Sequence, residues 1–146
     1  MLYDLVEKEN YIAFEKEIKK LNDISLLGIK ELAIKYLKYI MKLNSNLKEI
    51  LEDENYSLPF HKEVNEELIH EYNYKKFIYN DCLHECVKLL LQEITIKDSI
   101  KNLKENIYDS SLANDNPTAC SQKDKIEEKI SISIYENFKS ELELLI

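Results

Sequence analysis

A single glycine among 146 residues is the feature that most constrains how this chain can fold. β-Hairpins, barrels and phosphate-binding loops need many tight turns, and glycine and proline supply most of the residues that form them. This chain has two prolines beside its one glycine. Because 45% of its residues are hydrophobic and 33% are charged, it can still form a core. We therefore predict an all-α fold, a single compact helical bundle of five or six helices that spans residues 1–146 as one domain.

Apolar residues recur every three or four positions along most of the chain, as in helices that each bury one face. The predicted helices cover residues 5–21, 26–51, 59–73, 74–94, 97–108 and 122–145. The polar run at residues 44–46 and Asn73 each allow a bend or a break. The stretch from 75 to 94 has the widest apolar surface, so we expect it to be the central helix.

Residues 109–122 read DSSLANDNPTACSQ, a cluster of polar side chains and a proline with little apolar content. Such clusters are typical of connections between helices. We expect one long, flexible polar loop in the region of residues 109–122, between the last two helices.

The charge pattern narrows the partners that this chain can bind. All 20 basic residues are lysines, and 28 acidic residues give a net charge of −8. Without arginine, an NTPase or a reader of DNA sequence is disfavoured, and the negative charge repels nucleic acids and anionic membranes. No segment approaches the roughly 20 apolar residues that span a bilayer, and the acidic N-terminal residues do not resemble a signal peptide. We predict a cytoplasmic protein with neither a nucleic-acid partner nor a membrane span.

Cys82, His84 and Cys86 form a C-x-H-x-C run that invites a metal site. On a helix, however, residue 84 points away from residues 82 and 86, so the three side chains cannot close one tetrahedral site. A zinc site would need His61, His70 or Cys120 in addition. We favour buried, reduced thiols and predict no metal and no cofactor.

No sequence motif of a known catalytic site occurs in the chain. We therefore predict that it is not an enzyme. The alternative is a small enzyme with an unrecognised site, in which a cavity joins a cysteine or histidine to carboxylates.

Lys35, Lys38 and Lys42 share one face of the second predicted helix, with Tyr39 beside them. This patch is positive on an otherwise acidic chain, so it could bind an acidic partner. We predict that these four residues form a protein-binding site; the alternative is an ordinary solvated face.

The segment FIYNDCLHECVKLLLQEI, residues 77–94, resembles a motif in the C-terminal helical domain of longifolia-type plant proteins and of a large animal centrosomal protein. In that motif an apolar pair precedes an aromatic residue, an aspartate and then Asn-Glu or similar. Ile78-Tyr79 and Asp81 to Glu85 fill those places here, with His84 where asparagine is usual. The resemblance extends over roughly residues 39–143, through YIMKLNSNLKEILEDENY, PFHKEVNEELIHEY and IEEKISISIYENFKSELE. It implies recruitment to microtubules or centrosomes rather than catalysis.

The function that we predict is therefore a non-enzymatic protein–protein interaction module with a cytoskeletal role, which binds another, acidic protein. An alternative is a viral or parasite effector bundle that binds a host helix. The apolar end of the chain, Leu142 to Ile146, also suggests a helix that docks or forms a homodimer.

Overall fold

The computed structural model describes residues 2–52, 62–113 and 122–145, and in these ranges the chain forms six α-helices, one short 3-10 helix and no strand. The prediction of an all-α bundle is confirmed. The elements are α1 (Leu2–Glu7), α2 (Tyr11–Lys19), η1 (Ile24–Leu26), α3 (Leu27–Glu52), α4 (Lys62–Leu90), α5 (Ile96–Ala113) and α6 (Gln122–Glu143).

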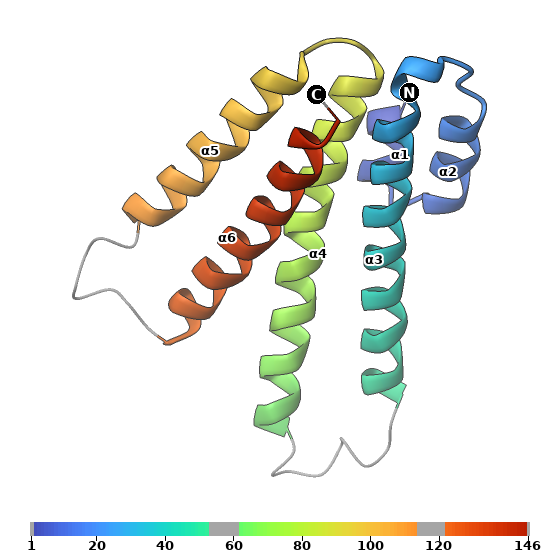
Figure 1. The fold of residues 1–146 in the computed structure, drawn as a ribbon. Helices are drawn as coiled ribbons and strands as arrows, with labels where there is room; N and C mark the ends of the chain where they lie inside the picture. The colour runs from blue at the N-terminus through green and yellow to red at the C-terminus, as the bar shows by residue number, and fades with distance from the viewer. Residues whose placement is uncertain (1, 53–61, 114–121, 146) are drawn as a thin grey trace.

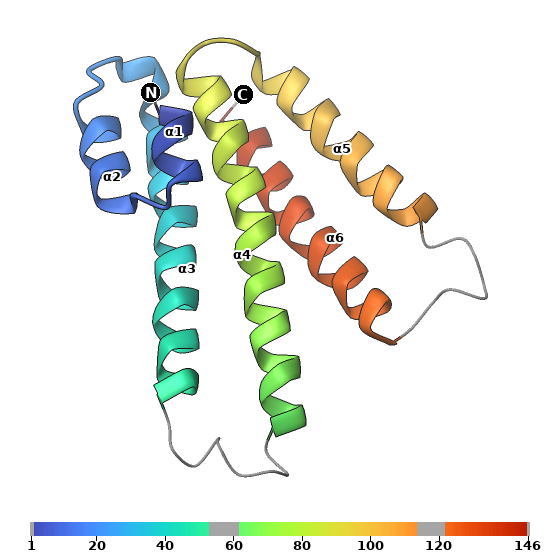
Figure 2. The same cartoon turned by 180° about the vertical axis from the view of Figure 1, so that it is seen from behind.

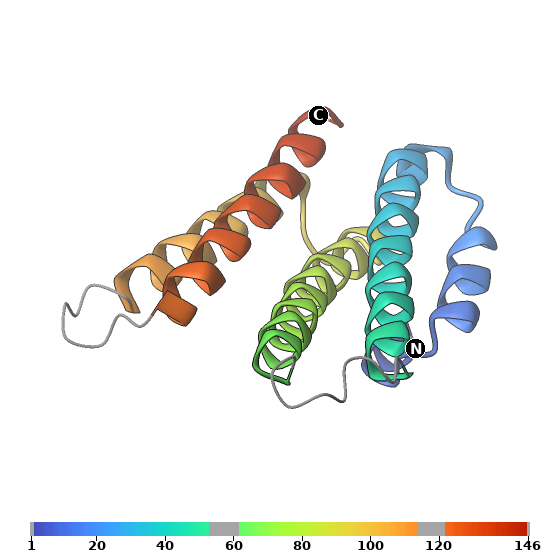
Figure 3. The ribbon, with the colours of Figure 1, turned by 90° about the horizontal axis from the view of Figure 1, so that it is seen from below.

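The long helices do not lie side by side in chain order. Helices α3 and α4 form an antiparallel pair (Figure 1). Helix α6 packs on α4 and runs parallel to it, and α5 packs on the other side of α6, so α6 lies between α4 and α5 (Figure 1). The short helices α1 and α2 pack on α4 and α3 respectively, near one end of that pair (Figure 2). A view along the long helices shows α5 and α6 on one side of α4 and α2 and α3 on the other (Figure 3). Helix α4 is therefore central, as expected.

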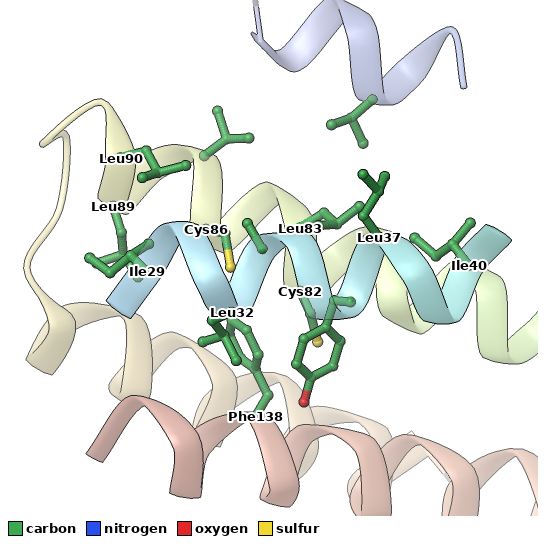
Figure 4. Close-up of a cluster of buried hydrophobic side chains, with 14 of the residues drawn as sticks. Ile29, Leu32, Leu37, Ile40, Cys82, Leu83, Cys86, Leu89, Leu90 and Phe138 are labelled. Carbon is green, nitrogen blue, oxygen red and sulfur yellow. The ribbon is translucent and has the colours of Figure 1, made fainter. Parts of the chain in front are cut away.

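The core lies mainly between α3, α4 and the C-terminal part of α6 (Figure 4). Leu37, Cys82, Cys86 and Phe138 have no exposed surface. Their side chains come from three helices that are far apart in the sequence. The wide apolar surface of the central helix is thus used to bury α3 and α6 together.

The first predicted helix, residues 5–21, is instead two helices. The chain leaves α1 through Glu9, which has a φ of 58°, and the side chain of Asn10 accepts a hydrogen bond from the Ala13 amide at 3.3 Å to begin α2. This turn lets Val6 and Phe14 both reach the core. A local asparagine cap therefore divides an apolar pattern that looked continuous.

The other polar interruptions behave differently. Helix α3 continues through residues 44–46 and α4 continues through Asn73, so neither run breaks a helix. Helix α4 ends at Leu90, earlier than residue 94, and Gln92 has a φ of 58°. Thr95 and Asp98 then form a capping box at the start of α5, with N–H···O distances of 3.4 and 3.2 Å.

The polar loop expected at residues 109–122 is shorter at both ends. Helix α5 includes residues 109–113, and α6 already begins at Gln122. The remaining residues, 114–121, lie outside the described part of the chain, as do the segment around Pro59 and His61. Asp109, Ser110 and Ser111 did not end α5, because the preference of these residue types against helix is only a fraction of a kcal/mol each.

The only glycine permits a close approach between the start of α3 and the C-terminal segment, which lie at the same end of the bundle (Figure 1). A Cβ atom on Gly28 would lie 2.4 Å from Cδ2 of Leu145, so the segment that follows α6 packs directly on the start of α3. Leu142 is fully buried, whereas Leu144 is 85% exposed. The apolar C-terminal segment thus docks in part on its own chain.

Candidate functional site

The four residues of the predicted site all lie on α3 and are exposed to solvent. Lys35, Lys38 and Lys42 follow one side of the helix because their spacing matches its period. Lys35 and Tyr39 also line a pocket between α3 and α6, whereas Lys38 and Lys42 lie outside its lining. The structure therefore places half of the predicted site at a concave surface.

This pocket, which we call the tyrosine pocket, has a volume of about 280 Å³. Its lining comes from three helices: Lys35, Tyr36 and Tyr39 of α3, Tyr79 of α4, and Ile134, Asn137, Ser140 and Glu141 of α6. Aromatic rings next to polar groups are the usual composition of a protein-binding surface.

The three tyrosine rings support one another. Tyr36 lies 5.6 Å from Tyr39 and 5.5 Å from Tyr79, and the rings of Tyr39 and Tyr79 are 5.4 Å apart, measured between centroids. The ring of Tyr36 also makes an edge-to-face contact with the buried ring of Phe138, with the ring centroids 5.1 Å apart. Burial raises the pKa of both Tyr36 and Tyr79, so their hydroxyls stay protonated and can donate hydrogen bonds. These contacts hold the rings in place before any ligand arrives.

Lys35 links the pocket to the lysine patch. Its ammonium group forms an ion pair with Glu141 of α6 and lies 6.0 Å from the centre of the Tyr39 ring. The hydrogen bond to Glu141 raises the pKa of Lys35. Lys38 and Lys42 form no ion pair with any residue that the structure describes. Their positive charges therefore remain available to a partner.

Sequence reasoning did not find the contributions of α4 and α6 to this pocket. Tyr79 and Glu141 are separated from Lys35 by 44 and 106 residues in the chain, and no local pattern marks them as neighbours. The only signal was the abundance of tyrosine, which does not say where the rings meet.

The C-x-H-x-C run is divided between two surroundings. Cys82 and Cys86 have no exposed surface, and burial raises the pKa of both thiols, so they stay protonated. His84 lies on another side of α4, where its ring stacks on Tyr3 at 6.0 Å. Among the residues described, no three His, Cys, Asp or Glu side chains could hold a metal ion. His61 and Cys120 lie outside the described residues, and His70 pairs with Glu127.

A larger cavity of about 450 Å³ lies on the other flank of α4, between α4, α5 and α6. We call it the α5 cavity. Its lining is Tyr74, Phe77, Ile78, Asp81, His84, Glu85, Lys88, Leu103, Ser131 and Tyr135. The enzyme alternative required such a cavity with a histidine near carboxylates, and His84 does lie here with Asp81 and Glu85.

The hydroxyl of Ser131 in this cavity is already engaged. It donates to the backbone oxygen of Glu127 at 2.9 Å and lies 2.7 Å from the Tyr74 hydroxyl. Within the described side chains, Ser131 has no hydrogen bond to His84 that would make a nucleophile and base pair. Of the cysteines, Cys82 and Cys86 are described, and neither lines the cavity. The described lining of the cavity therefore shows no serine or cysteine paired with a base.

Because the comparisons with known proteins gave no match, the two surfaces are interpreted from their own chemistry. None of the helices in the described ranges has a stretch that is long and apolar enough to cross a membrane. No family model, no curated protein and no solved structure matches the chain.

Proposed function

We propose that this chain is a non-enzymatic protein-interaction module that binds an acidic segment of another protein. The binding surface comprises the tyrosine pocket together with Lys35, Lys38 and Lys42, and we call it the lysine–tyrosine surface. The observation that carries the proposal is the contact between Lys35 and the Tyr39 ring, because it joins a preformed aromatic pocket to a positive patch.

Each part of this surface supplies a different contribution to binding. Tyrosine rings that are already packed lose little conformational entropy when a ligand covers them, and tyrosine is frequent among residues that dominate binding energy. Lysines at the rim attract an acidic segment over longer distances and raise the association rate. Because the net charge of the chain is −8, an acidic ligand is repelled elsewhere and directed to this patch.

Glu141 competes with the ligand for Lys35, because the two residues form an ion pair in the free protein. A carboxylate of the bound segment can take the place of Glu141, whose Oε2 atom is buried without a hydrogen-bond partner among the described residues. The side chain of Glu141 is 26% exposed and that of Lys35 is 47% exposed, so a ligand can reach both groups from solvent.

The resemblance to cytoskeletal proteins suggests what the acidic partner is. A tubulin tail is an acidic segment, so recruitment to microtubules or centrosomes would use this surface without any catalytic group. We include cytoskeletal recruitment in the proposal on that basis.

A matched pair of triple variants tests the proposal. Fluorescence anisotropy would measure binding of a labelled glutamate-rich peptide to the wild-type protein over a range of salt concentrations. Changing Lys35, Lys38 and Lys42 to Glu should weaken binding and flatten its salt dependence. Changing Lys97, Lys101 and Lys104 to Glu alters the net charge equally on α5, where all three lysines are exposed, and should have a much smaller effect.

Two outcomes would contradict the proposal. Equal loss in both triple variants would mean that only the overall charge matters, and no loss in either would mean that the lysines are an ordinary solvated face. The variant Tyr39→Ala tests the pocket separately, since it keeps every charge and should still reduce affinity. Unchanged affinity in that variant would remove the pocket from the binding surface.

A further inference from the structure

We propose that the α5 cavity binds an organic cation, an alkylammonium or guanidinium group, between the Asp81 carboxylate and the rings of Tyr74, Phe77 and Tyr135. This inference is independent of the lysine–tyrosine surface, which lies on the opposite flank of α4.

Asp81 supplies a carboxylate that is held in place; His84 and Lys88 attract it electrostatically and oppose the rise in its pKa that burial causes, but neither forms an ion pair with it. The buried Tyr135 hydroxyl donates a hydrogen bond to Oδ2 of Asp81 at 2.8 Å, which holds the carboxylate. Asp81 forms no ion pair with any residue in the described ranges. Burial raises its pKa, which indicates that the charged form is poorly solvated here. A half-buried carboxylate of this kind is stabilised by a cation.

The second carboxylate of the cavity already has partners of its own. Glu85, which is 6% exposed, pairs with Lys88 at 3.3 Å and accepts a hydrogen bond from the buried Ser99 hydroxyl at 3.2 Å. Lys88, the ammonium group among the described lining residues, is thus paired with Glu85 and attracts Asp81 only over a longer distance, and the ring of His84 stacks on Tyr3. A cation that enters from outside would therefore meet Asp81 as its partner.

Aromatic rings complete the chemistry of a cation site. Tyr74 and Phe77 lie nearly parallel, with centroids 6.4 Å apart and an interplanar angle of 29°, and Tyr135 lines the same cavity. Phe77 is 59% exposed, so a large apolar ring stands where it can cover a ligand. The faces of such rings attract alkylammonium and guanidinium groups within about 6 Å, and most strongly where water is excluded.

The size and lining of the cavity favour an organic cation over a metal ion. A volume of about 450 Å³ is in the range of small-molecule sites. A bare metal ion needs several charged ligands within about 2.5 Å, and the described residues hold no such group. Ile78 and Leu103 instead offer apolar surface to the carbon atoms of the ligand.

NMR titration of the full chain with tetramethylammonium chloride tests the site. Saturable shifts of the aromatic signals of Tyr74, Phe77 and Tyr135 are expected, and sodium chloride at the same ionic strength should not produce them. The variant Asp81→Asn keeps an oxygen that can accept from Tyr135 but removes the charge, and it should weaken binding by about tenfold or more. Glu136→Gln removes one charge at an exposed position of α6 and should leave the affinity unchanged.

A second variant guards against a change in folding. Phe77→Ala removes only the exposed ring and should also weaken binding while helicity, measured by circular dichroism, is retained. Equal shifts with sodium chloride, or wild-type affinity in Asp81→Asn, would overturn the proposal.

The source of the cation is assigned by a parallel titration with N-acetyl-lysine methylamide and methylguanidinium. Preference for the lysine derivative would indicate a side chain of a partner protein, and preference for either small cation would indicate a free metabolite. Both results support the site, whereas the absence of binding by all three probes would refute it.

Discussion

Replacing Phe138 by alanine tests whether α6 shares one cooperative core with α3 and α4. The Phe138 side chain lies in the core and has no exposed surface (Figure 4). Its ring stands at 88° to that of Tyr36. Truncation of a buried phenylalanine to alanine costs about 3 to 5 kcal/mol, because it loses apolar burial and leaves a cavity. A domain of this length has a total stability of roughly 7 to 20 kcal/mol, so the variant should still fold.

The same substitution at Phe77 is the matched control. Phe77 is 59% exposed, and its truncation should cost about 1 kcal/mol or less. Urea unfolding followed by circular dichroism would measure both variants against the wild type. We expect the free energy of unfolding of Phe138→Ala to be lower than that of Phe77→Ala by at least about 2 kcal/mol. In thermal unfolding, each kcal/mol should correspond to a shift in Tm of about 2 to 4 °C.

Two results would refute this reasoning. If both variants lost the same stability, Phe138 would not be packed between the three helices. If Phe138→Ala unfolded in two steps, with part of the helicity lost early, then α5 and α6 would form a separate unit. Tyrosine fluorescence offers a second probe, because the chain has ten tyrosines and no tryptophan.

Three further predictions follow from single sites. Gly28→Ala should lower the free energy of unfolding, measured in urea, by about 1 kcal/mol or less. The loss is small because the new methyl group meets the Leu145 side chain, which is at the surface and can move. Adding Leu145→Ala to that variant should remove the loss. In a Cys120→Ser variant, thiol reagents should label Cys82 and Cys86 only at the rate of unfolding, since both are buried and protonated. Burial raises the pKa of Asp81, so the stability provided by its protonated form is present below its usual pKa and lost as the pH rises through the raised value. Asp81→Asn should therefore be more stable than wild type at neutral pH, and urea unfolding should show the difference vanish near pH 3.

The helical pattern could be read from the sequence because each helix buries a regular apolar stripe. The break between α1 and α2 could not, since Val6 and Phe14 keep helical spacing across it and both are buried. Asn10 is a good cap residue, but the same residue type continues as helix in the run at 44–46. Local preference is worth a fraction of a kcal/mol per residue, and packing of the flanking turns decides the outcome.

The candidate site was readable only where its residues share one helix. The lysine face and Tyr39 follow from the period of α3. Tyr79 and Glu141 line the same pocket because α6 lies between α4 and α5. No local sequence pattern predicts this order of the helices in space. Apolar stripes of similar width can be paired in several ways, so the sequence leaves the neighbours of each helix open.

The position of α6 also explains why the chain has a cavity on each flank of its central helix. Successive residues of α4 rotate by about 100°, so Cys82, Leu83 and Cys86 face the core while Asp81, His84 and Lys88 fall together on another side. Read alone, that second side is an ordinary polar face directed at solvent. Because α5 packs on α6 and reaches α4 through the bond between Ser99 and Glu85, the same side becomes the wall of a cavity. A charge change at Asp81 should therefore be judged by the free energy of a half-buried group, and not by the small effects that are usual at a surface.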